Sequence, residues 1–445
     1  MAKVYISFLG TNDYVECIYD CESSGTNQPV RFVQETTLKR FAENAKAEDS
    51  AFIFTTDEAY EKNWVDDGHW DREKQCRKKC QGLETRIGLM NLPFPVERIR
   101  IPAGHSKPEI WEIFEIVYDV LKEGDDVVLD ITHAFRSIPM LAMVILNYAR
   151  VLKKINLLAI YYGAFEALGT ISEAKNMSVE KRKAPLLDLI SLDLLMRWTF
   201  AVDRFLGAGD AEAVSKLALD DVAPLRKETR GKDTDATAVK GVATALNFFS
   251  SRLATCRGPE IVQAGNFLKN ELGKAGNTNF IKAFYPLFEH ISKQVAPFIG
   301  DEVNDGIQAA QWCLNHNLIQ QGFTIRDETL ISYFVRRSGK DINDKTQREI
   351  ASAAASLARK NTPEEEWSGE AGKNKKTTKK YLELHKKEKS LLKLFGEISQ
   401  YRDDLNHAGY RQDMKKPEKF KNALKQILEG VCRLLEIRSE SEALP

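Results

Sequence analysis

The segment from Asp130 to Ser137, DITHAFRS, combines side chains that could bind an anion or move a proton. It holds a carboxylate, hydroxyls, an imidazole and a guanidinium between an apolar run and a helix-like run. Ser137 can cap that helix, whose free N–H groups and partial positive charge favour phosphate. The residue types therefore indicate two chemistries, catalysis by His133 or the binding of a phosphate-bearing ligand.

Two other apolar runs end in polar turns, LGTNDY and YYGAFE. Hydroxyls and a guanidinium donate hydrogen bonds to phosphate, and an aromatic ring can stack on a base. The three turns supply the candidate ligand-binding residues: Gly10, Thr11, Asn12, Asp13, Tyr14, Thr132, His133, Ala134, Phe135, Arg136, Ser137 and Gly163. A capped helix in which Asp130 only satisfies nearby backbone donors is the alternative.

A second group, SQYRDDLNHAGYR, contains Arg402 and His407. An arginine can hold a scissile phosphate while a histidine moves protons between the 2′-hydroxyl and the leaving oxygen, without a metal ion. Residues five apart on an ideal helix lie about 140° around its axis. The pair therefore does not share one face, but a helix end at Gly409 that frays, together with the long arginine side chain, can bring the two groups together. The alternative is a helix-end pair bonded to Asp403, Asp404 or a carbonyl.

The N-terminal part alternates short apolar runs with helix-like segments, which predicts a doubly wound parallel sheet over residues 1–175. Ligands bind beyond the carboxyl ends of the strands in such sheets, where the polar turns lie. Helices are expected in TLKRFAENAKA, KPEIWEIFEIVYDVLKEG and SIPMLAMVILNYARVLKK. Strands are expected in AKVYISFLG, PVRFVQ, SAFIFTT, FPVERIRIPAG, DDVVLD and INLLAIYYGAF.

The remainder, residues 176–445, has the apolar spacing of amphipathic helices and predicts an all-helical domain. Its helices are expected in LLDLISLDLLMRWTFAVDRFL, AVKGVATALNFFSSRLATC, EIVQAGNFLKNELGKA, IQAAQWCLNHNLIQQGFTIRDETLISYFVRR, KSLLKLFGEISQYRDDLNHA and PEKFKNALKQILEGVCRLLEIRS. Residues 361–389 are charged and rich in lysine. They are interpreted as a solvated loop and helix start, or as a local patch that attracts RNA.

The composition excludes several classes of protein. Lys+Arg and Asp+Glu are both 64 in 445 residues, so no global basic field indicates nucleic acid. Neither a signal peptide nor an apolar run long enough for a bilayer is evident, so a cytoplasmic protein without a membrane partner is expected. GxGxxG and GxxxxGK[ST] fingerprints are absent. Seven cysteines fit reduced thiols, and Cys76, Cys80 and His69 form only a weak metal pattern, so no metal site is predicted.

The polar groups together resemble those of the type III CRISPR ancillary ribonucleases. DITHAFRSIP is similar to the DxTHG signature of that family, SFLGTNDY and YYGAFE to its other sheet motifs, and RDDLNH to its R-x4-H nuclease motif. The resemblance covers essentially the whole chain. It implies a Rossmann-like sensor domain (CARF) over residues 1–175 and a helical HEPN ribonuclease domain over residues 176–445. Ala134 departs from the signature glycine, and its methyl group narrows the approach of a ligand.

The resemblance also implies a homodimer or a higher even oligomer. Two sensor domains would share one cyclic oligoadenylate as activator, with cyclic tetraadenylate favoured, and its binding would activate a distant site. Cleavage of single-stranded RNA to a 2′,3′-cyclic phosphate would need no cofactor or metal and would use Arg402, His407, Asp403 and Asn406. The residues leave two alternatives open, a non-catalytic cyclic-nucleotide-binding regulator or dimerisation module, and slow cleavage of the cyclic ligand by the sensor domain.

Overall fold

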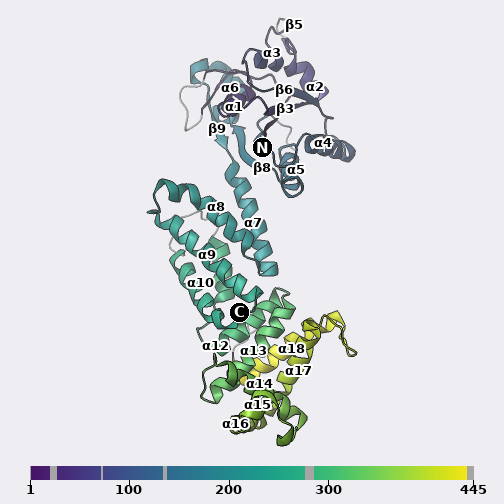
Figure 1. Cartoon of the computed structure of the whole chain (residues 1–445). Coiled ribbons are helices and arrows are strands. Elements are labelled where there is room, and N and C mark those ends of the chain that lie inside the picture. The colour runs from purple at the N-terminus through teal and green to yellow at the C-terminus, as the bar shows by residue number, and fades with distance from the viewer. Residues whose placement is uncertain (1, 21–27, 72–73, 134–137, 276–284, 438–445) are drawn as a thin grey trace. The chain divides into compact units, whose positions relative to one another are not determined.

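The computed structural model divides the chain into two compact units, residues 1–194 and 195–445 (Figure 1). It describes residues 2–20, 28–71, 74–133, 138–275 and 285–437, without the side chains of residues 138–139 and 285–287. The first unit continues past residue 175, the boundary expected from the sequence, because β9 (Lys183–Asp188) pairs with β8 (Asn156–Gly163) in its sheet.

The first unit is built on a seven-stranded sheet of order β2-β9-β8-β7-β1-β3-β6. All pairings are parallel except that between β8 and β9. The order β6-β3-β1-β7-β8 reverses direction beside β1, so β1 and β7 flank the topological switch point of a Rossmann-like sheet. The predicted fold class is thereby confirmed. The other strands of this sheet are β1 (Lys3–Leu9), β2 (Ile18–Asp20), β3 (Ser50–Thr55), β6 (Val96–Arg100) and β7 (Asp126–Asp130).

Helices cover both faces of this sheet, which explains why β1 is buried from Val4 to Leu9 and is mostly apolar. Ile6 of β1 packs with Ile113 of α4 and Ile145 of α5 on one face. Tyr5 of β1 packs with Leu38 of α1 on the other face. Figure 1 shows these helices on opposite sides of the sheet. The helices of the first unit are α1 (Val33–Ala42), α2 (Asp57–Ala59), the π-helix η1 (Tyr60–Trp64), α3 (Leu83–Gly88), α4 (Lys107–Asp119), α5 (Ile138–Lys153) and α6 (Ile171–Asn176).

Three local predictions for this unit were wrong or incomplete. The segment PVRFVQ was expected to be a strand, but only Val30 forms an isolated bridge, and α1 begins at Val33. The reason is a cap, because the Glu35 carboxylate accepts hydrogen bonds from two preceding backbone N–H groups. The residues LLD, expected to start a helix, belong to strand β9. The hairpin of β4 (Trp70–Asp71) and β5 (Cys76–Arg77) was not predicted.

The second unit contains no strand among its described residues, which confirms the predicted all-helical region. The long segment expected after residue 306 is two helices, because Asn317 takes a left-handed backbone conformation between them. No helix in the described ranges is long and apolar enough to cross a membrane. The helices from the division onward are α7 (Ile190–Ala208), α8 (Glu212–Glu228), α9 (Thr234–Ala254), α10 (Ile261–Ala275), α11 (Tyr285–Val295), α12 (Glu302–Asn315), α13 (Ile319–Arg337), α14 (Lys345–Lys360), α15 (Gly369–Lys373), α16 (Lys375–Lys387), α17 (Lys389–Asn406) and α18 (Pro417–Leu435).

Candidate ligand-binding and catalytic sites

Asp130, the last residue of β7, is fully buried and ties three elements together. Its carboxylate accepts hydrogen bonds from the Tyr5 hydroxyl of β1 at 3.0 Å, the Thr37 hydroxyl of α1 at 2.9 Å and the Thr132 backbone N–H at 3.0 Å. Burial raises the pKa of Asp130 above its ordinary value, although the hydrogen bonds from Thr132, Thr37 and Tyr5 oppose this effect. Asp130 therefore shapes the turn that follows β7 and is itself closed to solvent.

The turn after β7 contacts the turns after β1 and β8. The Gly163 N–H of β8 donates to the Thr132 hydroxyl at 2.9 Å. Gly10 lies so close to the β7 turn that a Cβ atom there would stand 2.7 Å from the His133 carbonyl oxygen and 2.4 Å from the Tyr14 hydroxyl. Only glycine fits this approach. The structure thus brings together the three polar segments that the sequence identified as a ligand site.

His133 lies on this junction with its ring stacked on Tyr14 at a centroid distance of 4.0 Å. Its Nε2 atom is buried without a hydrogen-bond partner among the described residues. Burial lowers the pKa of His133 to about 3, so the ring is neutral at neutral pH. A neutral, stacked imidazole is suited to contacting a ligand and poorly suited to donating a proton as a general acid.

Asn63, which no sequence motif marked, clamps the turn after β1. Its amide nitrogen donates to the carbonyl oxygens of Gly10 and Asn12, both at 2.9 Å, and its amide oxygen lies 2.9 Å from the His69 Nε2 atom. Asn63 is fully buried in the π-helix η1, an element often found at functional sites. His69 therefore supports, through Asn63, the turn after β1. In the sequence it was only part of a weak metal-ligand pattern.

Asp13 in the same turn is surrounded by cations. Arg31 lies 3.7 Å and Lys175 3.8 Å from its carboxylate, and Lys78 donates a short hydrogen bond to it. Burial acts to raise the pKa of Asp13, but the hydrogen bond and charge of Lys78, with the charges of His69 and Lys175, hold it below the ordinary value. Three permanent cations around one carboxylate leave a local positive excess that favours an anionic ligand.

The other candidate ligand residues are placed less fully. Thr11 is half-buried and Asn12 is exposed on the β1 turn. Ala134, Phe135, Arg136 and Ser137 lie outside the described residues, so the predicted helix cap and phosphate donor remain predictions.

Arg402 of α17 is held by two carboxylates of α13. Asp327 accepts a short hydrogen bond from Nη1 of Arg402, and a Glu328 carboxylate oxygen lies 3.8 Å from its Nη2. Ser399, one turn earlier on α17, donates to the other oxygen of Asp327 at 3.3 Å. Asp327 is 2% exposed, and burial raises its pKa to about 6 against the opposing charge of Arg402. Sequence spacing could not reveal this partner, because α13 lies far from α17 along the chain.

The residue before this pair, Arg326, is also enclosed by the helices. It is fully buried, and its three guanidinium nitrogens have no hydrogen-bond partner among the described residues. Burial lowers the pKa of Arg326 to about 9, although Cys432 and Asp327 nearby act to raise it.

His407 lies at the end of α17, where the helix stops at Asn406. Ala408 and Gly409 have positive φ angles of 51° and 75°, which turn the chain out of the helix. His407 and Asn406 are exposed, and Asp403 is paired with Arg411 at 3.7 Å. No hydrogen bond joins Arg402 to His407, both of which the structure describes. The helix therefore ends where the sequence indicated. Arg402 is bound to the carboxylates of α13, whereas His407 is exposed to solvent.

Metal-ligating side chains do not gather anywhere in the described part of the chain, where no group of three or more His, Cys, Asp or Glu residues could hold an ion. Cys76 is exposed on β5 and Cys80 is half-buried, each as a free thiol.

Comparison with known proteins shows that part of this chain is distantly related to a known protein. No protein-family model matches this chain. Over 120 residues it is 33% identical to the CRISPR-associated protein MJ1674 of Methanocaldococcus jannaschii. The chain is related to a CRISPR-associated protein. The alignment covers 26% of this chain and only 17% of that relative, so the similarity supports the predicted association with CRISPR and extends to one part of each protein.

Proposed function

We propose that this protein is a CRISPR-linked ribonuclease whose first unit binds a cyclic oligoadenylate and whose second unit cleaves single-stranded RNA. The observation that carries the proposal is the junction of three polar turns at the switch point between β1 and β7, where Gly10 meets His133 and Thr132 meets Gly163. The cations around Asp13 suit a phosphate-bearing ring. The relationship to a CRISPR-associated protein supports a role in antiviral defence.

The exposed face of α5 supports a homodimer in which two sensor turns meet. Met140, Val144, Tyr148 and Val151 are 73%, 57%, 49% and 76% exposed and lie within about 80° around the helix axis. Such an apolar stripe beside the ligand turn is typical of a surface that a partner covers. Val144→Glu/Val151→Glu is expected to yield a monomer that no longer binds cyclic oligoadenylate, measured by sedimentation and calorimetry. A dimer that persists in this variant would contradict the assignment.

Arg402 and His407 would carry out the cleavage in the second unit. A guanidinium has five N–H donors, so the contacts to Asp327 and Glu328 leave donors for a scissile phosphate. His407, exposed at the end of α17, would carry the proton from the 2′-hydroxyl to the leaving 5′-oxygen. The 2′-oxygen attacks phosphorus as its proton passes to His407, and the bond from phosphorus to the 5′-oxygen breaks as that oxygen takes the proton, so the products are a 2′,3′-cyclic phosphate and a 5′-hydroxyl. Asn406 directly precedes this exposed histidine, and Asp403 lies one helical turn before it.

The deciding experiment measures cleavage of single-stranded RNA with and without cyclic tetraadenylate or cyclic hexaadenylate. Cleavage is expected to require one of the rings, to resist EDTA, and to fall at least a hundredfold in His407→Ala. Activity without either ring, no activity with both, or full activity in His407→Ala would contradict the proposal.

The pairing of Arg402 with Asp327 also supports a second candidate function. In this alternative the carboxylates neutralise Arg402 for structural reasons, and the protein is a nucleotide-binding regulator whose helical unit dimerises or contacts a partner. The regulator predicts tight binding of the cyclic ligand and no RNA cleavage under any condition. The same cleavage assay, combined with calorimetric titration of the ring, separates the two functions.

A further inference from the structure

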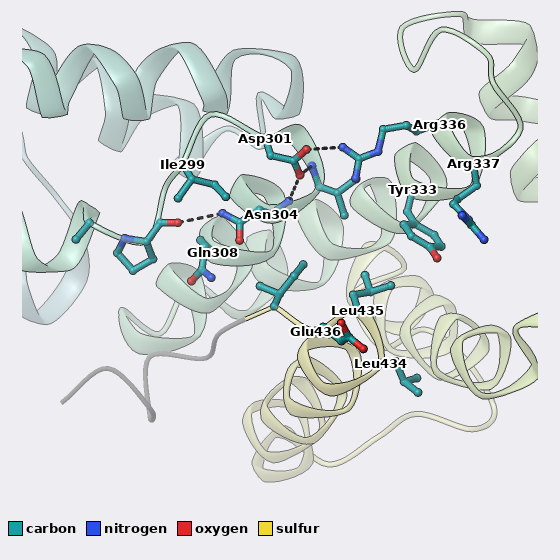
Figure 2. A pocket seen from close by; sticks show the side chains of 14 residues that line it. Ile299, Asp301, Asn304, Gln308, Tyr333, Arg336, Arg337, Leu434, Leu435 and Glu436 are labelled. Atoms are coloured by element: carbon teal, nitrogen blue, oxygen red, sulfur yellow. Dashed lines mark hydrogen bonds and ion pairs between the residues drawn. The ribbon is translucent and has the colours of Figure 1, made fainter. Parts of the chain in front are cut away.

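A cavity of about 850 Å³ lies in the second unit, between α12, the end of α13 and the end of α18 (Figure 2). Figure 2 shows Tyr333, Arg336 and Arg337 along one side of it and Leu434 and Leu435 on another. Arg336 is paired with Asp301 at 2.5 Å. The volume falls within the range of small-molecule sites, and the combination of aliphatic and aromatic walls suits a flat heterocycle. The apolar lining consists of Ala296, Pro297, Ile299, Val303, Leu434, Leu435 and Ile437.

The aromatic wall of the cavity is joined to a lysine-rich segment. The Tyr333 hydroxyl donates to a Glu388 carboxylate oxygen at 3.1 Å, and Nε of Arg337 lies 3.7 Å from the same oxygen. Glu388 stands between Lys387, where α16 ends, and Lys389, where α17 begins. Glu388, within the lysine-rich segment 361–389 that the sequence marked as a possible RNA-attracting patch, therefore contacts the aromatic edge of the cavity.

Lysines of α16 form a face without carboxylate partners. Helix α16 buries Thr378, Tyr381 and His385, and the opposite side carries Lys376, Lys380 and Lys387 within about 40° around its axis. These three lysines, the lysine face, are exposed and form no ion pair with any described residue. Two adjacent lysines are paired, in contrast to the lysine face: Lys375 and Lys379 lie 3.9 and 2.8 Å from carboxylate oxygens of Glu364.

We propose that the lysine face and the adjoining cavity form a docking site for single-stranded RNA, with phosphates on the lysines and one base in the cavity. The proposal rests on the proposed ribonuclease function and names a substrate contact distinct from Arg402 and His407. A base can enter a cavity only when it is unpaired, which favours a single strand over a duplex. The Tyr333 ring offers a stacking surface, and the uncompensated lysines attract the backbone although the chain as a whole is neutral.

The lysine face is tested by binding of a labelled single-stranded RNA to the full chain carrying His407→Ala, which prevents turnover. Lys376→Gln/Lys380→Gln/Lys387→Gln is expected to lower the slope of log K against log salt by about 2, since each lost phosphate contact contributes about 0.7. Binding near 0.1 M salt is expected to weaken by about tenfold or more. The matched control, with the same loss of charge on α8 and α9, is Lys216→Gln/Lys227→Gln/Lys240→Gln, and it is expected to bind RNA as the parent does.

The cavity is tested by two substitutions at Tyr333. Tyr333→Leu removes the stacking ring and is expected to weaken RNA binding about fivefold or more. Tyr333→Phe keeps the ring and loses only the hydrogen bond to Glu388, so binding is expected to change by less than about twofold. Thermal unfolding of both variants reports whether the fold is retained. Unchanged RNA binding in a folded Tyr333→Leu protein would overturn the role of the cavity.

The outcomes separate this proposal from the ribonuclease function. If RNA binding falls in the lysine-face variant but no ring activates cleavage in the parent chain, the docking site stands and the nuclease proposal fails. If a ring activates cleavage and the lysine-face variant keeps the parental KM and salt slope, the nuclease stands and the docking site is overturned. Equal weakening in the control variant, or anionic vesicles binding the lysine face while RNA binding is unaffected, would also overturn it.

Discussion

Asp130 in the sheet unit and Asp327 in the helical unit are both buried carboxylates beside a candidate site, at 0% and 2% exposure. Burial raises the pKa of each. Their partners differ in kind. Asp130 accepts hydrogen bonds from two neutral hydroxyls and a backbone N–H, whereas Asp327 holds the guanidinium of Arg402.

This difference separates two ways of building a site. The partners of Asp130 are groups of the protein core and backbone, none of them a candidate catalytic group. The carboxylate therefore fixes the shape of a turn, and other residues of that turn would contact the ligand. The partner of Asp327 is itself a candidate catalytic group that is 31% exposed. The position of the Arg402 guanidinium therefore depends on the charge of the Asp327 carboxylate. A substrate phosphate can compete with that carboxylate for the guanidinium.

The largest effect is expected from Asp130→Ala. The substitution removes the carboxylate that accepts hydrogen bonds from the Tyr5 hydroxyl, the Thr37 hydroxyl and the Thr132 N–H in a closed core. The free energy of unfolding of the sheet unit is expected to fall by about 3–5 kcal/mol, measured by chemical denaturation. Glu115→Ala on the exposed side of α4 is the control and should change it by less than about 0.5 kcal/mol. A small loss in Asp130→Ala would show that the network is dispensable.

Arg402→Ala should have the next largest effect, because it leaves the buried Asp327 without its cation. We expect a loss of about 2–4 kcal/mol in the free energy of unfolding of the helical unit at pH 7. Adding Asp327→Asn to Arg402→Ala should recover part of this loss, and a double-mutant cycle measures the coupling. Additive effects of the two substitutions would mean that the ion pair contributes nothing to stability.

The dependence of the unfolding free energy on pH tests the environment of Asp327 in the helical unit. The folded pKa of Asp327, about 6, lies above the ordinary value of 3.8, so its favourable contribution is complete below about pH 4 and is lost as pH rises to about 6. Relative to Asp327→Asn, the parent protein should therefore lose about 2–3 kcal/mol of unfolding free energy over this interval and stay level above it. A flat profile for Asp327 would contradict the raised pKa.

The smallest effect on stability is expected from His407→Ala. The imidazole is exposed at the end of α17, so the free energy of unfolding should change by less than about 0.5 kcal/mol in the same denaturation experiment. This result matters for function, because a loss of RNA cleavage in His407→Ala then reports on chemistry, whereas a loss in Arg402→Ala also reflects unfolding. Marked destabilisation by His407→Ala would mean that the histidine has a structural role.

Much of the fold could be predicted because its signals are local. The runs that became β1, β3, β7 and β8 are short and largely apolar, and amphipathic segments separate them. The edge strand β2 and its neighbour β9 were missed because they are short or only partly buried, which leaves little apolar pattern. The segment PVRFVQ was misassigned because the side chain of Glu35, outside the apolar run, caps α1 within it.

The candidate sites divide in the same way. Residue types alone marked Gly10, Thr132, His133 and the pair Arg402 and His407 as candidate site residues. A polar turn after a buried strand and an Arg/His pair near a helix end are both patterns of neighbouring residues in the sequence. The tertiary structure decided that Asp130 is structural, that Asn63 and His69 clamp the β1 turn, and that Asp327 holds Arg402. These partners lie on other elements, and only packing brings such side chains within hydrogen-bonding distance.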